Sequence, residues 1–295
     1  MKVRVIQRHE GEGVFPVFKK GTQVILGKET DHFPHWYACE IEGRQTYIAD
    51  AFVNNGRLLI DYNPTELVQE VGDVLEVREV VYDWLLAKND IGITGWIPMD
   101  VSAVVDDSIY ELWDILDANG KKTGRLHVRG QPMATGDYHL IVHVWKRNKK
   151  GEWLINKRAN QHGHSSFGNI GGKWETTGGC AVAGDDSLSA ALRETKEELG
   201  LRLDAEKGKM WKRIPRYGDD GHTWFTDVWI FEHDCTIDEV NLQETETTAA
   251  MWASTETIFE MMAADEFIGD EFYPYFKEMV LAATPVVSGI SFFVK

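Results

Sequence analysis

Cysteine is scarce in this 295-residue chain, and long apolar runs are lacking. The three cysteines, Cys39, Cys180 and Cys235, are scattered, and no two of them form a CxxC pair. This usage excludes a disulfide framework and a zinc ribbon, and it is typical of a reducing cytosol. No apolar run approaches the ~18 residues of a membrane span. Charges interrupt residues 1–10, where a signal peptide needs apolar residues. We therefore expect a soluble, cytoplasmic protein.

Basic residues are also few relative to acidic ones. The chain has 31 Lys and Arg against 47 Asp and Glu, a formal net charge of −16. This balance argues against a protein whose main task is to coat nucleic acid or an anionic membrane. The charge is uneven, because residues 121–216 carry 19 basic and 10 acidic residues whereas residues 217–295 carry 2 and 16. A basic middle is consistent with an anion-binding site and equally with chance clustering on a solvated surface.

The composition is otherwise that of a globular chain, with 43% hydrophobic residues, eleven Trp and thirteen Phe to fill cores. Its length predicts about two domains, or three if one is small. After residue 110 the patterning is mixed α/β. The periodicity predicts strands over 138–145, 152–155 and 223–231, and helices over 187–199, 254–264 and 269–282.

Residues 1–105 contain a weak internal repeat. A Gly-led apolar run precedes Trp36, and a second such run precedes Trp84, 48 residues later. Each Trp is followed by a glycine turn and another short β-rich run, which indicates small barrels or a sandwich. The order of Gly72-Asp73, Trp84 and Gly95-Trp96-Ile97-Pro98 resembles SH3-like domains.

This resemblance implies two tandem SH3-like β-barrels, over residues 1–54 (a degenerate copy) and 55–105. It implies a peptide or polymer ligand held by Trp36, Trp84 and Trp96. The other interpretation is that these aromatic residues fill small cores, which need large side chains for burial. We favour the core interpretation.

Residues 187–199 are predicted to form an amphipathic helix. Asp185 or Asp186 is suited to the N-cap, and Gly200 to the left-handed position that ends a helix. At about 100° per residue the apolar side chains form one stripe. Its members are Leu188, Ala191, Leu192, Thr195 and Leu199.

Three carboxylates occupy the opposite side of this helix. Glu194, Glu197 and Glu198 fall within an arc of about 100°, and the basic neighbours Arg193 and Lys196 lie outside it. Like charges at this spacing repel one another. A hard divalent cation such as Mg²⁺ would relieve the repulsion, because it takes oxygen ligands. The helix alone leaves a metal site and a solvated acidic face equally open.

The flanking residues point to the metal site. A Gly178-Gly179 turn precedes the helix, and such a turn lets the backbone pass close to a ligand. From Gly179 the segment runs through Asp185 to 193–201, Arg-Glu-Thr-Lys-Glu-Glu-Leu-Gly-Leu, which resembles the Nudix box. The resemblance covers residues 108–275. One departure is that Asp185, one methylene shorter, stands where the family usually has Glu, so its pairing with Arg193 is left open.

The resemblance implies an α/β/α sandwich over residues 108–295, so that the whole chain is an α+β multidomain protein. It implies Mg²⁺ or Mn²⁺ held by Glu194, Glu197, Glu198 and the carbonyl of Gly178, with Arg193 orienting the glutamates. The implied activity is hydrolysis of the diphosphate bond in a nucleoside diphosphate linked to another moiety. Metal-assisted attack of water on phosphorus needs only one carboxylate as base.

The family places its base at different positions. Glu194 is one candidate and Glu246 is another, because Glu246 lies in a segment that resembles the family's second acidic loop. Lys157 and Arg158 end a predicted strand, where relatives often place a phosphate-binding Arg. The structural alternative for Glu246 is a solvated loop carboxylate. The structural alternative for Lys157 and Arg158 is a solvated pair at a strand end.

Two other functions remain as alternatives. The stretch from residue 111 to Trp174 also resembles isopentenyl-diphosphate isomerase, a Nudix relative that needs a catalytic Cys five residues after this Trp. Gly179 stands there, and Cys180 is one residue away. The second alternative is a non-catalytic nucleotide sensor whose SH3-like domains transmit the signal. We expect a small-molecule diphosphate substrate, with no membrane or nucleic-acid partner, and a homodimer stays open.

Overall fold

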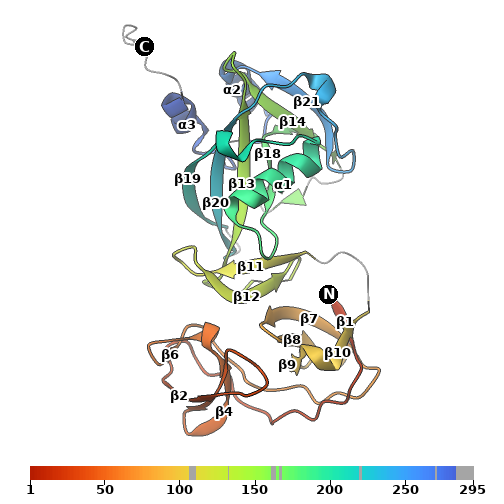
Figure 1. The fold of residues 1–295 in the computed structure, drawn as a ribbon, viewed down its shortest axis with the longest axis vertical. Coiled ribbons are helices and arrows are strands. Elements are labelled where there is room, and N and C mark those ends of the chain that lie inside the picture. Colours follow the sequence, from red (N-terminus) through yellow and green to blue (C-terminus); the bar gives the residue numbers. More distant parts are fainter. Residues whose placement is uncertain are drawn as a thin grey trace. The chain divides into compact units, whose positions relative to one another are not determined.

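The computed structural model describes residues 1–105, 111–131, 133–160, 164–165, 168–218, 221–269 and 271–283. The chain forms two compact units (Figure 1). Unit 1 comprises residues 1–140, 181–184 and 221–224, and unit 2 comprises 141–180, 185–220 and 225–295. None of the helices in the described ranges has the length and the apolar stretch needed to cross a bilayer.

Unit 1 is built almost entirely from short antiparallel strands. They are β1 (Lys2–Val5), β2 (Val24–Glu29), β3 (Trp36–Ile41), β4 (Arg44–Ala49), β5 (Val53–Asn54), β6 (Arg57–Leu58), β7 (Val74–Val81), β8 (Trp84–Lys88), β9 (Thr94–Pro98), β10 (Ser102–Val104), β11 (Leu112–Leu116) and β12 (Lys122–Val128). The hairpin β3–β4 shows why these residues form strands. Glu42 (φ 50°) and Gly43 (φ 76°) make the two-residue turn that closes the Ile41–Arg44 pair.

The internal repeat is present element by element. The meander β2–β3–β4 is followed by a 3₁₀ turn (Asp50–Phe52) and β5, and β7–β8–β9 is followed by a 3₁₀ turn (Met99–Val101) and β10. Trp36 opens β3 and Trp84 opens β8, so the two tryptophans hold equivalent positions. The N-terminal β-rich region that the sequence predicts is therefore confirmed. Strand β1 pairs with both β7 and β10, so the first residues of the chain complete the second copy.

The two copies of the repeat share one aromatic core. The ring centroids of Trp36 lie 5.4 Å from those of Trp84 and 5.5 Å from those of Trp96. Trp96 is 3% exposed, and its Nε1–H donates to the Asn63 carbonyl at 3.0 Å. Trp96 is therefore a core residue, as the structural interpretation of the aromatic residues predicts.

A buried ion cluster joins β12 to the rest of unit 1. Arg125, 2% exposed, donates from Nη1 and Nη2 to Asp137 at 2.8 and 2.7 Å, and from Nε to Glu79 at 2.5 Å. Burial raises the pKa of the Glu79 carboxyl, and the charge of Arg125 opposes that rise. Removal of one partner from such a cluster costs more than the cluster contributes, because the remaining charges stay buried.

We expect Arg125→Ala to lower the free energy of unfolding by about 3–5 kcal/mol, because Glu79 and Asp137 lose their counter-charge. The matched control is Arg129→Ala, which breaks an exposed pair with Glu111 and should cost about 1 kcal/mol or less. Urea unfolding of the two variants measures the difference. Equal losses of unfolding free energy in the two variants would show that the buried cluster stabilises the fold no more than an exposed ion pair does.

Unit 2 is a sheet with helices. Its elements are β13 (Tyr138–Arg147, which begins in unit 1), β14 (Trp153–Arg158), β15 (His164–Ser165), β16 (Gly168–Asn169), β17 (Trp174–Glu175), β18 (Thr177–Cys180), α1 (Ser187–Leu199), β19 (Gly208–Tyr217), β20 (Thr223–Glu232, which also begins in unit 1), β21 (Thr247–Ala253), α2 (Thr255–Ala263) and α3 (Phe276–Ala283). Strand β13 pairs with β14, β18 and β20, and β14 also pairs with β17 and β21.

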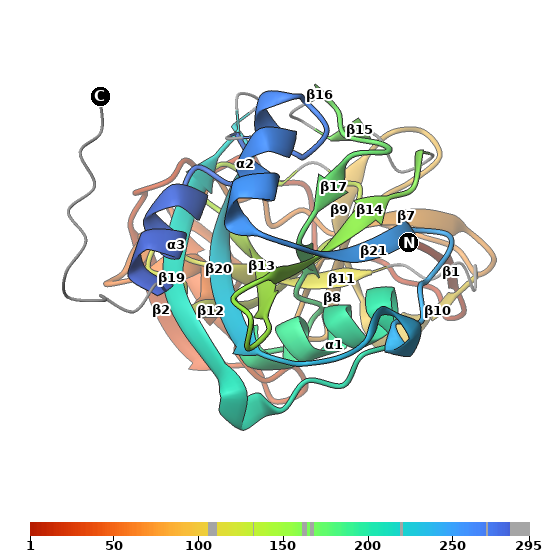
Figure 2. The ribbon, with the colours of Figure 1, turned by 90° about the horizontal axis from the view of Figure 1, so that it is seen from above.

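Helices cover both faces of this sheet (Figure 2). Successive side chains of a strand point to opposite faces. Ile155 of β14 packs in one cluster with residues of α2 and α3, whereas Leu154 packs in another with Leu199 of α1. The two layers of helices therefore enclose the sheet.

The predicted elements agree with this architecture except near the C-terminus. Helix α1 has the predicted bounds, and α2 lies within the predicted range. The helix predicted over 269–282 is wrong in its first half, because α3 begins only at Phe276. Pro274 lies in the predicted range, and proline removes a backbone donor and disfavours the helical conformation of the residue before it.

Candidate active site

Helix α1 begins and ends where its capping residues dictate. Asp186 accepts a hydrogen bond from the Ser189 N–H at 2.7 Å, and the Asp186 N–H donates to Ser189 Oγ at 2.8 Å. This capping box decides between the two candidate N-caps in favour of Asp186. Gly200, at φ 68°, ends the helix in the left-handed conformation. Asp185 is therefore left for another partner.

The two glycines before the helix are required by close approaches. A Cβ at Gly179 would lie 2.4 Å from the carboxylate carbon of Glu194, and a Cβ at Gly178 would lie 2.5 Å from the Val142 carbonyl oxygen. No side chain fits in either place. Strand β18 therefore runs directly beneath the Glu194 carboxylate, and the Gly178-Gly179 pair lies within this strand, not in the turn that the sequence predicts.

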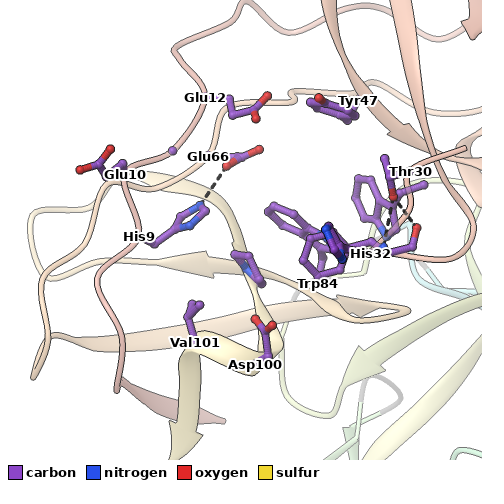
Figure 3. Close-up of a pocket in the computed structure, with 14 residues that line it drawn as sticks. His9, Glu10, Glu12, Thr30, His32, Tyr47, Glu66, Trp84, Asp100 and Val101 are labelled. Carbon is purple, nitrogen blue, oxygen red and sulfur yellow. Dashed lines mark hydrogen bonds and ion pairs between the residues drawn. The ribbon is translucent and has the colours of Figure 1, made fainter. Parts of the chain in front are cut away.

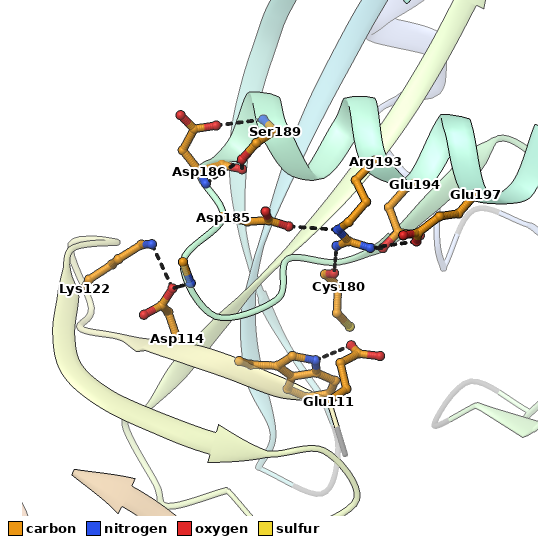
Figure 4. A network of polar contacts seen from close by, with 12 residues as sticks. Glu111, Asp114, Lys122, Cys180, Asp185, Asp186, Ser189, Arg193, Glu194 and Glu197 are labelled. Carbon is orange, nitrogen blue, oxygen red and sulfur yellow. Dashed lines mark hydrogen bonds and ion pairs between the residues drawn. The ribbon is translucent and has the colours of Figure 1, made fainter. Parts of the chain in front are cut away.

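Arg193 donates hydrogen bonds to four residues around the beginning of α1 and the end of β18 (Figure 4). Its Nε donates to Asp185 at 3.0 Å, and its Nη2 donates to the Cys180 carbonyl at 2.9 Å. Its Nη1 donates to Glu194 and to Glu197, both at 2.9 Å. The shorter Asp185 thus still reaches Arg193, which the sequence left open.

The three carboxylates of the helix lie in three different environments. The side chain of Glu197 is 52% exposed, and that of Glu194 is 12% exposed. Glu198 is buried, and its Oε2 has no hydrogen-bond partner among the described residues. Burial raises the pKa of Glu198 well above its usual range, and the charges of Glu175 and Glu194 raise it further. Glu198 is therefore the carboxylate that most needs a cation.

A buried lysine lies near this group, and the sequence analysis missed it. Lys146 of β13 is fully buried, and its Nζ donates to Thr177 Oγ1 at 2.6 Å. Burial lowers the pKa of Lys146 to about 7, and the charge of Glu198 opposes that change. Thr177 Oγ1 in turn donates to Asn156 Oδ1 at 3.2 Å. The available signal was strand alternation, because Lys146 is in phase with the buried Val144.

Arg158 and Lys157 lie at the end of β14, as predicted, with different partners. Arg158 Nη1 donates to the two carboxylate oxygens of Glu175 at 2.9 and 3.2 Å. Burial raises the pKa of Glu175 to about 7, and Arg158 opposes this shift. Lys157 Nζ lies 5.8 Å from the centroid of the Trp174 ring, within the range of a cation–π contact.

Glu246 occupies the turn just before β21. Its side chain is exposed, and its carbonyl accepts a hydrogen bond from the Ala159 N–H at 2.7 Å, beside the end of β14. The negative charge of Glu246 contributes to the raised pKa values of Glu175 and Glu198. The structure thus brings Glu246 within electrostatic reach of the carboxylates of α1 and β17.

The oxygen donors of this group partly fit a divalent cation. In the parts of the chain that the structure describes, no three His, Cys, Asp or Glu side chains are arranged to enclose a metal ion. Glu194 and Glu197 are both turned toward Arg193. The buried Glu198 oxygen without a partner and the all-oxygen donor set nevertheless suit Mg²⁺, which keeps several waters and needs only one or two carboxylates.

Comparisons with known proteins find relatives of this chain. The NUDIX domain family matches residues 137–276. An uncharacterized Nudix hydrolase of Listeria monocytogenes is 32% identical over 167 residues, which are 56% of this chain and 90% of that protein. Nudix hydrolase 3 of Arabidopsis thaliana is 27% identical over 164 residues, 53% of this chain and 21% of that protein. A crystal structure of a Deinococcus radiodurans protein covers 57% of this chain and 98% of its own, with 20% identity and a TM-score of 0.45.

The site combines a capped helix rich in carboxylates, a preceding strand with a Gly-Gly pair, and one arginine that bonds to both. Together with the family match, these features place the protein in the Nudix class. The chain belongs to the Nudix family, with its Nudix domain at residues 137–276 and a β-rich region before it. It is a Nudix hydrolase, a pyrophosphohydrolase that acts on acid anhydrides. The family typically uses divalent metals, and its fold implies a small-molecule diphosphate substrate.

We expect Arg193→Met to lower the free energy of unfolding by about 1–3 kcal/mol, because Asp185 and the Cys180 carbonyl lose a charged donor. Repulsion between Glu194 and Glu197 should add to the loss. The control is Arg202→Met, at an exposed position shortly after the helix. Denaturant unfolding of both variants measures the effect, and a loss no larger than that of the control would contradict this role of Arg193.

Proposed function

We propose that unit 2 hydrolyses the diphosphate bond of a nucleoside diphosphate linked to another moiety, with a divalent cation and water as the attacking group. One observation carries this proposal. Glu198 has a buried carboxylate oxygen without a partner, and the charges of Glu175, Glu194 and Glu246 act on it. A cation bound there would relieve this repulsion and would also attract the anionic diphosphate.

Glu194, Glu197, Glu198 and the carbonyl of Gly178 would hold the Mg²⁺ or Mn²⁺ ion. The bound metal supplies polarisation of a phosphoryl oxygen and a lowered pKa of its water. Arg193 keeps Glu194 and Glu197 on the correct side of α1 through its two Nη1 hydrogen bonds. Its bond to the Cys180 carbonyl keeps β18 against the helix.

The chain offers two candidates for the base. Glu246 is exposed at its turn, so it can approach a substrate-side water and take its proton. Glu194 lies closer to the glycine strand and is already held by a hydrogen bond from Arg193, so it is less free to approach a water. We therefore favour Glu246 as the base. Arg158 and Lys157 supply the positive charge for the phosphates.

The isomerase alternative is less well supported. It needs a thiol where this chain has Gly179, and a Cβ at that position would collide with Glu194. Cys180 takes part in the site through its backbone carbonyl, which accepts from Arg193. Loss of Glu197 or Glu198 would favour the nucleotide sensor, whereas both residues are present.

We also propose the domain organisation that the sequence predicts, with SH3-like copies over 1–54 and 55–105 and the Nudix domain over 108–295, except that strand β1 of the first range completes the second copy. The repeated order of meander, 3₁₀ turn and strand supports the two copies. A peptide or polymer ligand for these copies, a homodimer and a cytoplasmic location stay predictions.

The test is Mg²⁺-dependent hydrolysis of a panel of nucleoside diphosphate sugars, dinucleotides, ADP-ribose and nucleoside triphosphates. We expect Glu198→Gln to lower kcat/KM for the preferred compound by about 10²–10⁴-fold, because the amide binds a hard cation poorly. Glu206→Gln, an exposed carboxylate of the same unit, is the matched control and should retain activity.

Two results would contradict the proposal. One is that no diphosphate compound is cleaved although nucleotides bind with Mg²⁺, which would favour the sensor. The other is that Glu198→Gln keeps the activity of the control, which would place the chemistry elsewhere in unit 2.

A further inference from the structure

Helices α2 and α3 form the walls of a surface pocket in unit 2, which we call the α2–α3 pocket. The two helices lie on the same face of the sheet (Figure 2). The pocket has a volume of about 690 Å³, within the range of small-molecule sites. None of its described lining residues belongs to the Nudix box. They come from α2, from the first turn of α3 and from the segment 269–274 between the helices.

The walls of the α2–α3 pocket are apolar and partly aromatic. Phe276 and Tyr273 are 1% and 3% exposed, and both belong to the main core of unit 2. Phe259 is 37% exposed, and its ring centroid lies 5.3 Å from that of Phe276. Met262 also lines the pocket, and methionine adapts its shape to a ligand readily. An apolar ligand that covers these side chains removes them from water, which favours its binding.

Lys277 is the one charged residue of this lining. It is also the only Lys or Arg of residues 217–283, which contain 16 Asp and Glu. Among the described residues no carboxylate lies within ion-pair distance of its Nζ. The neighbouring Glu278 of α3 pairs instead with Lys212 of β19. The α2–α3 pocket therefore combines apolar walls with one positive charge that is available to an anion.

A pocket in unit 1 has the opposite charge (Figure 3). It also has aromatic walls, but none of its described lining residues is Lys or Arg. Four carboxylates line it: Glu10, Glu12, Glu66 and Asp100. A ligand with an apolar body and a negative charge is repelled by these carboxylates, whereas Lys277 attracts it. Charge thus distinguishes the two pockets for such a ligand.

We propose that the α2–α3 pocket binds a small anionic amphiphile, in which an apolar body carries one carboxylate or sulfonate group. The body lies against Phe259, Met262 and Phe276, and the anionic group pairs with Lys277 Nζ. Burial of apolar surface supplies most of the affinity. The ion pair contributes less, because it is exposed to solvent, but it selects the sign of the ligand's charge.

The experiment is a fluorescence titration of the full chain with anilinonaphthalene sulfonate and with N-phenylnaphthylamine, which lacks the sulfonate. We expect Lys277→Gln to weaken binding of the sulfonate by about two- to fivefold and to leave the neutral compound unaffected, because only an exposed ion pair is lost. Phe259→Ala should weaken both by about fivefold or more, because apolar contact area is lost. The matched controls are Lys209→Gln and Ile237→Ala, at exposed positions of the same unit, and they should bind as the unchanged protein does.

A second readout locates the ligand. In ¹³C–¹H spectra of methyl-labelled methionine, the resonance of Met262 should shift on titration with the sulfonate. The resonance of Met210, which is exposed on β19, should not shift. A shift of Met210 alone would overturn the proposal. So would equal sulfonate affinity in Lys277→Gln and Lys209→Gln, or in Phe259→Ala and Ile237→Ala.

Two other occupants of the pocket would give different results, and either result would overturn the proposal. A dimer in sedimentation velocity that Phe259→Ala dissociates would assign the pocket to a second copy of the chain. Sulfonate binding that occurs only in a chain ending at Ala283 would assign it to residues 284–295. The titrations contain no diphosphate, so their outcome is independent of the proposed hydrolysis.

Discussion

Like-charge repulsion around Glu198 is the constraint on which the arrangement of unit 2 depends. The carboxylates of Glu175, Glu194 and Glu246 all act on this buried group, and each raises its pKa. Charges in a poorly solvated site interact far more strongly than they would in water. The chain must therefore supply positive charge from several directions to keep these carboxylates together.

Three cations from different elements supply that charge. Arg193 pairs with Glu194 and Glu197 of α1, and Arg158 pairs with Glu175. Lys146 is buried and donates a hydrogen bond to Thr177. Lys146 and Arg158 lie on neighbouring strands, so the sheet itself provides the counter-charge to the helix. Among the described residues, Glu198 is the one carboxylate with a buried oxygen that lacks a hydrogen-bond partner. The negative charge of this carboxylate would suit a metal ion that also binds the phosphates of a substrate.

The part of this site that lies within one stretch of chain could be predicted from the sequence. The bounds of α1, its caps and the side occupied by Glu194 follow from periodicity and spacing, which are local properties, whereas the predicted glycine turn is part of strand β18. The hydrogen-bonded group of Lys146, Thr177 and Asn156 could not be predicted this way, because these residues meet only when β13, β14 and β18 pair. The C-terminal helix was predicted too long because apolar periodicity continues through Pro274, where the backbone cannot remain helical. In unit 1 the repeat was visible, but the shared aromatic core depends on contacts between its two copies.

Direct titration of Mn²⁺ into the full chain tests the central claim that the group around Glu198 exists to hold a cation. We expect saturable binding that Glu198→Gln weakens by about tenfold or more, whereas Glu206→Gln leaves it unchanged. The measurement needs no substrate, so it does not depend on which diphosphate the enzyme prefers. Equal Mn²⁺ affinity in Glu198→Gln and in the unchanged protein would contradict the account, since the unpaired oxygen would then have no part in metal binding.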